Sequence, residues 1–173
     1  AGVEVFHRLK KILHDMKLST GVGDEGGFAP VFDEEKPHEQ ALSAIMQAIK
    51  DSGYKAGTEI FLALDCAASE FVSAEPMASG VGYTFENKNY SAGELIEIYT
   101  KWVDVYPIIS IEDGLAEHDW EGWSMLTAKL GKRCQLVGDD LFVTNPSFLR
   151  RGIESRIANA ILIKLNQIGT VTE

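Results

Sequence analysis

Acidic residues follow three short apolar runs of the sequence, and a lysine ends a fourth. The acidic residues are Asp65, Glu112 and Asp139, and the lysine is Lys164. Ionised groups beside buried apolar segments are costly unless they are paired or bound to a metal. Three carboxylates at one site would repel one another without a cation, and oxygen ligands without His or Cys favour Mg²⁺ over Zn²⁺. We therefore predict a magnesium site at these three residues.

Two interpretations of these charges are open. The carboxylates could be helix N-caps or surface charges, because loops after strands often carry Asp for that purpose. Lys164 could extend out of a strand end into solvent. Alternatively, a lysine held among apolar residues near Mg²⁺ has a lowered pKa and can act as a base. The repetition of the acidic pattern after three consecutive runs favours one shared site.

The elements that must position these residues alternate along the chain. Continuous apolar runs are typical of strands buried on both faces of a parallel sheet, and they lie at 60–64, 108–111, 135–137 and 160–165, with 20–23 as a weaker first strand. Helical spacing of apolar residues predicts helices around 6–16, 42–49, 95–102, 123–130 and 145–153. Residues 73–93 are expected to form a loop that holds a short hairpin around 83–85. Strict alternation predicts an α/β fold.

Charges at strand ends favour a barrel over an open sheet, because active sites of (β/α) barrels lie at the carboxyl ends of the strands. About five β/α units fit into this length, whereas a closed barrel has eight units in ~250 residues. We therefore expect a partial (β/α) TIM-type barrel, and interpret the 173 residues as an internal piece of a longer protein.

A glycine-rich segment, GVGDEGGFAP at residues 21–30, presents Asp24 and Glu25. It contains the spacing GxGxxG, but two acidic residues would face a bound pyrophosphate, and Pro30 follows in place of a helix. Dinucleotide binding is therefore not expected. A flexible loop that presents a carboxylate suits a general acid, with an ordinary turn as the alternative.

Composition excludes several functional classes. The chain has 26 Asp and Glu against 16 Lys and Arg, a formal net charge of −10, which argues against nucleic acid as a partner. No apolar run approaches the ~18 residues of a membrane span, and no signal peptide is recognisable. Cys66 and Cys134 form no CxxC motif. The sequence does not exclude a disulfide between them, but we expect reduced thiols and a cytoplasmic location.

Six sequence blocks resemble those of the enolase family, in the same order and over nearly the whole chain. They are GDEGGFAP (23–30), LALDCAASEF (62–71), SIEDGL (110–115), DWEGW (119–123), VGDDLFVTN (137–145) and ILIKLNQIGTVTE (161–173). Each block alone is a weak motif, whereas six blocks in the same order are specific for the family. The IEDGL form resembles bacterial more than animal enolases.

The resemblance implies a glycolytic lyase that uses Mg²⁺ to interconvert 2-phosphoglycerate and phosphoenolpyruvate. By this resemblance, Glu25 corresponds to the acid that helps the 3-hydroxyl leave, and Lys164 to the base that removes the C2 proton. Asp65, Glu112 and Asp139 correspond to the Mg²⁺ ligands. Glu112, Asp139 and Lys164 also border the substrate.

The resemblance further implies a cytoplasmic homodimer or larger homo-oligomer, with residues 1–173 as the central part of the C-terminal barrel domain. The N-terminal domain and the last barrel units, which bind the phosphate and a second Mg²⁺, would lie outside, so we expect the chain alone to be inactive. One alternative is another enolase-superfamily enzyme that abstracts a proton beside a carboxylate; GDEGGFAP and the pair Asn166-Gln167 argue against it. The other is a non-catalytic structural role, or a secreted or surface-bound role as a plasminogen receptor, which no residue supports.

Overall fold

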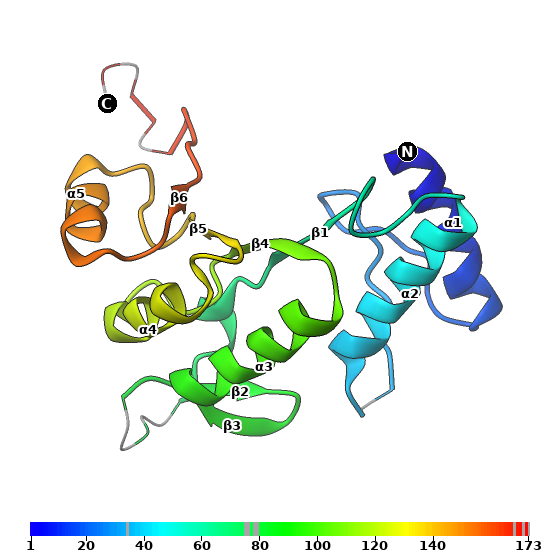
Figure 1. Cartoon of the computed structure of the whole chain (residues 1–173), viewed down its shortest axis with the longest axis horizontal. Coiled ribbons are helices and arrows are strands. Elements are labelled where there is room, and N and C mark those ends of the chain that lie inside the picture. The colour runs from blue at the N-terminus through cyan, green and yellow to red at the C-terminus, as the bar shows by residue number, and fades with distance from the viewer. Residues whose placement is uncertain (34, 75–76, 78–79, 168, 171, 173) are drawn as a thin grey trace. The chain divides into compact units, whose positions relative to one another are not determined.

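The computed structural model describes residues 1–33, 35–74, 77, 80–167, 169–170 and 172 (Figure 1). The chain forms two compact units, residues 1–61 and residues 62–173. Our assignment of the whole chain to the central part of one barrel domain stays a prediction. Cys66 and Cys134 are free thiols, as expected. Within the described ranges, no helix has the length and apolar character needed to cross a membrane.

The first unit contains two helices that pack against each other, α1 (Gly2–Asp15) and α2 (Pro37–Asp51). Both follow the predicted helical spacing of apolar residues. Leu13 of α1, and Ala48 and Ile49 of α2, are at most 1% exposed. The core of this unit therefore lies between the apolar faces of the two helices.

Residues 20–23 do not form the predicted first strand. Only Val22 pairs, through an isolated antiparallel bridge to Phe28. Glycine-rich backbone loses more entropy on ordering and offers few side chains for packing. In the described part of this unit no other strand lies beside Val22, which is 57% exposed. The prediction is wrong because the segment folds back on itself instead of joining a sheet.

The second unit is built on a four-stranded sheet with the strand order β1-β4-β5-β6. Its strands are β1 (Leu62–Asp65), β4 (Ile108–Glu112), β5 (Gln135–Gly138) and β6 (Ala160–Ile161). All neighbouring pairs are parallel, so the four carboxyl ends lie at one edge of the sheet. This confirms the predicted α/β fold of a partial (β/α) barrel.

Strand β6 is shorter than the run at 160–165 predicts. Leu162 still donates its N–H to the carbonyl of Gly138 at 3.2 Å, but Lys164 donates its N–H to the side chain of Thr144 at 3.0 Å. Among the described residues no strand pairs with the other side of β6. The residues after Ile161 therefore leave the ladder, and the predicted length is wrong although the position is right.

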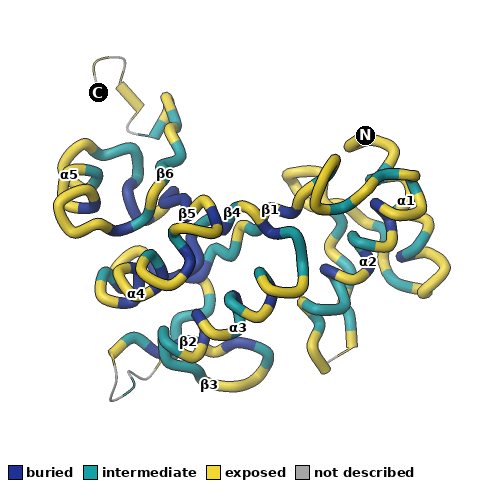
Figure 2. Tube along the Cα trace, in the orientation of Figure 1, coloured by how far each residue is buried: buried dark blue, intermediate teal, exposed yellow. Residues whose placement is uncertain are grey.

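Helices α3 (Ala92–Val105) and α4 (Trp120–Leu130) lie on one face of the sheet, where buried residues concentrate (Figure 2). Ile111 of β4 and Leu126 of α4 are both fully buried. They approach each other around Gly114, where an added Cβ would lie 3.1 Å from Ile111 and 3.2 Å from Leu126. The apolar core of the second unit therefore lies between this face and the two helices.

The loop after β1 contains a short 3-10 helix and the expected hairpin. In the hairpin, β2 (Gly82–Phe85) pairs antiparallel with β3 (Lys88–Ser91). Glu86 and Asn87 at its tip both have positive φ, as a two-residue type I′ turn requires. The remaining helix, α5 (Pro146–Ser155), has the predicted proline in its first turn.

Candidate active site

The predicted ligands Asp65, Glu112 and Asp139 all lie at the carboxyl edge of the sheet. Asp65 and Glu112 are register partners at the ends of β1 and β4, and Cys66 donates its N–H to the carbonyl of Glu112 at 2.9 Å. Asp139 directly follows the last residue of β5. The three residues thus share the edge at which barrel enzymes place their active sites. Their joint role as metal ligands stays a prediction.

None of these three carboxylates caps a helix. The side chains that cap α3, α4 and α5 are those of Ser91, Asp119 and Asn145. Asp65 makes a local turn instead, because its Oδ1 accepts the N–H of Ala67 at 3.2 Å. For the helices that the structure describes, the N-cap interpretation of the acidic pattern is therefore wrong.

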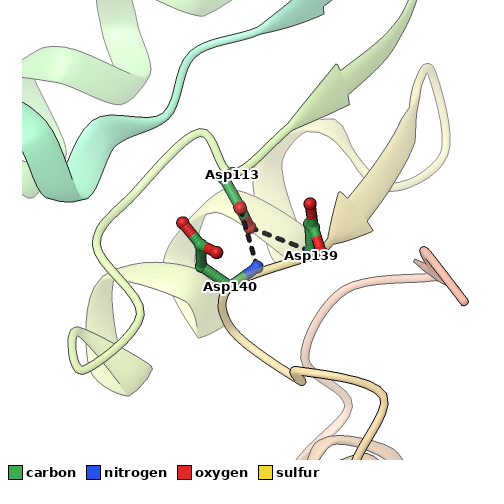
Figure 3. A group of neighbouring side chains, drawn as sticks. All are labelled: Asp113, Asp139 and Asp140. Carbon is green, nitrogen blue, oxygen red and sulfur yellow. Dashed lines mark hydrogen bonds between the residues drawn. The ribbon is translucent and has the colours of Figure 1, made fainter. Parts of the chain in front are cut away.

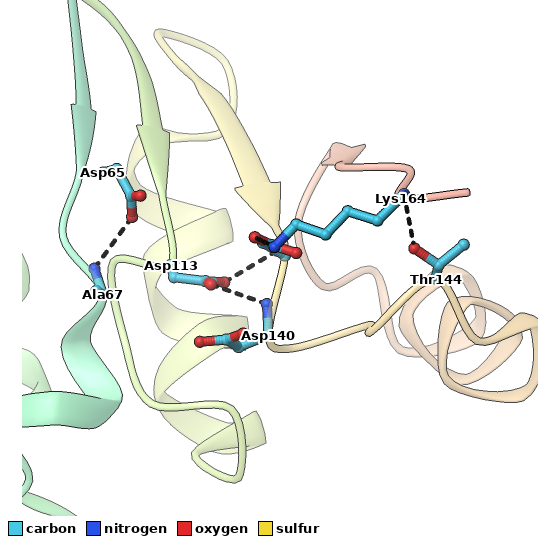
Figure 4. Close-up of polar contacts among 7 residues, drawn as sticks. Asp65, Ala67, Asp113, Asp140, Thr144 and Lys164 are labelled. Atoms are coloured by element: carbon cyan, nitrogen blue, oxygen red, sulfur yellow. Dashed lines mark hydrogen bonds and ion pairs between the residues drawn. The ribbon is translucent and has the colours of Figure 1, made fainter. Parts of the chain in front are cut away.

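Lys164 lies in the segment after β6 (Figure 4), and its amine pairs with the side chain of Asp139. Its Nζ lies 2.5 Å from Oδ2 of Asp139, with the lysine side chain 42% and the aspartate side chain 12% exposed. The hydrogen bond to Asp139 raises the pKa of Lys164 above its ordinary value, and this outweighs the opposing effect of burial. The predicted lowering of the lysine pKa depends on a Mg²⁺ ion beside Lys164, and it stays a prediction.

Glu112 lies among negative charges. Burial is the largest cause that raises its pKa, and the charges of Asp65 and Asp139 raise it further. Asp113 adds to this repulsion, whereas Lys164 opposes it. The neighbouring carboxylates therefore disfavour the charged form of Glu112, and a cation placed among them would reverse that effect.

Asp113, which the sequence analysis did not single out, is buried at the same edge (Figure 3). Its Oδ1 accepts the backbone N–H of Asp139 at 3.1 Å, and its Oδ2 accepts that of Asp140 at 2.8 Å. Oxygens of these three carboxylates lie within 4.8 Å of one another, close enough to hold a metal ion. Burial raises the pKa of Asp113, with the two amides opposing the shift. The sequence signal was only its place after Glu112 in SIEDGL.

Two acidic sets therefore overlap at Asp139: the predicted set with Asp65 and Glu112, and a second set with Asp113 and Asp140. Oδ1 of Asp139 is buried and has no hydrogen-bond partner among the described residues. A buried carboxylate oxygen without a partner is costly, and a hard cation such as Mg²⁺ would satisfy it. Both oxygens of Asp113 already accept amides. Asp139 is the shared member through which this donor set fits Mg²⁺. Among the described residues, only Asp113, Asp139 and Asp140 bring three carboxylate oxygens within 4.8 Å of one another, and the predicted set does not.

Glu25 lies in the first unit, in the glycine loop. Gly23 donates its N–H to the carbonyl of Gly27 at 2.9 Å, which closes the loop around the exposed Glu25. Phe28 stacks on Phe6 of α1 with ring centroids 4.4 Å apart, so the end of the loop is fixed to the helix. Over the described residues 27–33, which follow the glycines, the backbone forms no helix. The role of Glu25 as an acid stays a prediction.

Comparison with protein families assigns the whole chain to one family. The family model described as "Enolase, C-terminal TIM barrel domain" matches residues 1–173. The match agrees with the parallel sheet of the second unit and with the charged carboxyl edge that this sheet presents.

Proposed function

Because the chain belongs to the family of enolase C-terminal TIM barrel domains, we propose that its protein is a Mg²⁺-dependent lyase that interconverts 2-phosphoglycerate and phosphoenolpyruvate. Family membership supports a lyase of the enolase superfamily. The finer proposal rests on the contact of Lys164 with Asp139, whose Oδ1 has no partner among the described residues. An amine beside a candidate metal ligand is placed for proton abstraction once a bound cation there lowers its pKa, and enolase-superfamily enzymes are known to combine a Lys or His base with Mg²⁺.

Each residue is assigned a separate task. The C2 proton of 2-phosphoglycerate is weakly acidic because the neighbouring carboxylate is already negative, and we assign its removal to Lys164. Asp65, Glu112 and Asp139 would hold Mg²⁺, and the bound ion would supply positive charge where negative charge develops on the substrate. Glu25 donates a proton to the leaving 3-hydroxyl, which departs as water.

Isotope exchange separates the base from the acid. In the full-length protein, Lys164→Ala is expected to abolish exchange of the C2 proton with solvent, followed by NMR in D₂O. Glu25→Gln is expected to retain exchange and to lose phosphoenolpyruvate formation, followed by absorbance, because the two residues act in different steps. The exposed Lys132→Ala serves as the control and should keep both activities. Exchange that persists without Lys164 and disappears without Glu25 would reverse the assignment.

A second experiment decides between the two acidic sets. Mn²⁺ binding, followed by electron paramagnetic resonance, is measured for Asp139→Asn, Asp65→Asn and Asp140→Asn. Loss of Asp139 should weaken binding in either case, because it belongs to both sets. We expect Asp65→Asn to weaken binding by at least ~10-fold, since one anionic ligand is lost, and Asp140→Asn to have a smaller effect. The opposite order would place the ion between Asp113, Asp139 and Asp140.

We also propose a cytoplasmic location, a role in glycolysis and assembly into a homodimer or larger homo-oligomer, all supported by the resemblance. Sedimentation velocity of the full-length protein tests the assembly. A single boundary at the mass of one chain would contradict it.

A further inference from the structure

The loop between β5 and α5, residues 139–145, has an unusual backbone. The carbonyl of Asp139 accepts the N–H of Val143 at 2.8 Å, which closes one helical turn. Val143 and Thr144 then adopt φ angles of 42° and 55°. β-Branched residues rarely occupy this left-handed region, and they do so only where surrounding contacts enforce it, often beside functional sites. Contacts at the two ends of the loop hold this backbone in place.

Asp113 fixes the start of the loop. Its carboxylate accepts the N–H groups of Asp139 and Asp140 at 3.1 and 2.8 Å. Its own N–H donates to the carbonyl of Val137 in β5, and its carbonyl accepts the N–H of Ala68 after β1, both at 3.0 Å. One buried residue thus joins the ends of β1, β4 and β5, and it holds the backbone from which the Asp139 side chain projects.

Thr144 fixes the end of the loop to the candidate base (Figure 4). Its Oγ1 accepts the backbone N–H of Lys164 at 3.0 Å, at a point where the chain has already left the ladder of β6. The lysine side chain then returns to Asp139, with Nζ 2.5 Å from Oδ2. Loop, threonine, lysine and aspartate therefore form a closed ring that holds Lys164 at both its backbone and its amine.

We propose that Asp113 and Thr144 are positioning residues that set the amine of Lys164 against Asp139 through the 139–145 loop. The inference rests on the proposed function for the tasks of Lys164 and Asp139. A lysine side chain has many rotamers, and fixing the backbone at its base restricts where the amine can lie. Because misplacement of a reacting group by ~1 Å can cost ~10²-fold in rate, the expected effect is on proton abstraction and not on substrate affinity.

Two substitutions of Thr144 test the end of the ring in the full-length protein. Thr144→Val keeps the β-branched shape and removes the acceptor, whereas Thr144→Ser keeps the acceptor. We expect the valine variant to lose ~10–10²-fold in kcat for C2 proton exchange, with KM changed by less than ~3-fold, and the serine variant to recover most of the rate. A valine variant with wild-type kcat would overturn the proposal, and so would a serine variant as slow as the valine variant.

A crystal structure of Thr144→Val separates this inference from the proposed function. The proposal expects Nζ of Lys164 to move away from Oδ2 of Asp139, whatever substrate the protein uses. An ion pair that stays in place without the threonine acceptor would overturn the positioning role. A wild-type protein that exchanges no C2 proton of 2-phosphoglycerate would instead contradict the proposed function, and the crystal structure would still decide the inference.

Asp113→Asn tests the start of the ring. Asparagine can accept only one of the two amides and presents an NH₂ group to the other, so the turn that carries Asp139 should shift. We expect Mn²⁺ affinity to fall ~10–10²-fold, with the exposed Asp104→Asn as the matched control. Unchanged affinity in a folded variant would overturn the role of Asp113. If circular dichroism finds the variant unfolded, the Thr144 pair and its crystal structure decide the proposal.

Discussion

The helix-covered face and the carboxyl edge of the same sheet follow opposite rules. On the covered face, Ile111 and Leu136 are register partners of β4 and β5 and are fully buried and apolar, and Ile111 approaches Leu126 of α4 around Gly114. At the edge, burial and then the charges of Asp65 and Asp139 raise the pKa of Glu112, and Asp139 keeps an oxygen without a partner among the described residues. Non-glycine residues after β1, β4 and β5 have positive φ. Stability is thus concentrated on the covered face, while repulsion and strain are concentrated where a ligand could relieve them.

A core substitution should give the largest effect on stability and leave the edge chemistry intact. Leu126→Ala removes a fully buried side chain beside Ile111 and Gly114. We expect a loss of about 2–5 kcal/mol in the free energy of unfolding, measured by urea denaturation. Met125→Ala, at a neighbouring position that is 47% exposed, is the control and should stay within ~0.5 kcal/mol of wild type. A similar loss in both variants would mean that burial on this face is not the main source of stability.

At the carboxyl edge, removal of a charge should increase the free energy of unfolding, whereas the core substitution lowers it. The pKa of Glu112 is raised from its ordinary value of 4.5 in the folded chain, so between these two values the folded state binds more protons than the unfolded state. The free energy of unfolding therefore falls as pH rises from 4.5 through the raised pKa, and the penalty is then constant. Glu112→Gln cannot titrate and avoids this penalty.

We therefore expect Glu112→Gln to be more stable than wild type in metal-free buffer, with a difference that grows as pH rises through this window. Urea denaturation at a series of pH values measures it. Added Mg²⁺ should stabilise wild type more than the variant, because only a ligand set that binds the ion gains from mass action. The idea fails if the difference in free energy of unfolding between variant and wild type is constant from pH 4 upward. The charged form of Glu112 would then not destabilise the folded chain.

The same contrast explains what could be predicted from sequence. Buried runs and caps predicted the four strands of the sheet and α5, because burial and helix initiation depend on nearby residue types. The predictions of a strand at 20–23 and of a strand over the full run 160–165 were wrong, because a strand also needs a neighbouring strand to pair with. Spacing placed Asp65, Glu112 and Asp139 at one edge. It could not reveal the roles of Asp113 and Thr144, whose side chains accept backbone N–H groups of segments distant in sequence.

Charges on the solvent side of the helices should matter least, and they sharpen the comparison with the edge. Lys129 of α4 pairs with Glu97 of α3, with Nζ 2.6 Å from Oε1, and the two side chains are 44% and 55% exposed. Water solvates both charges in the unpaired state, so pairing gains little. A double-mutant cycle with Lys129→Ala and Glu97→Ala should give a coupling free energy of about 0.2–1 kcal/mol, measured by urea denaturation. In 1 M salt, where the Debye length is about 3 Å, the coupling should decrease. The contrary result is a coupling free energy that is as large as the Leu126→Ala loss and does not change with salt. It would mean that exposed charges affect the free energy of unfolding as strongly as the partly buried charges of the carboxyl edge.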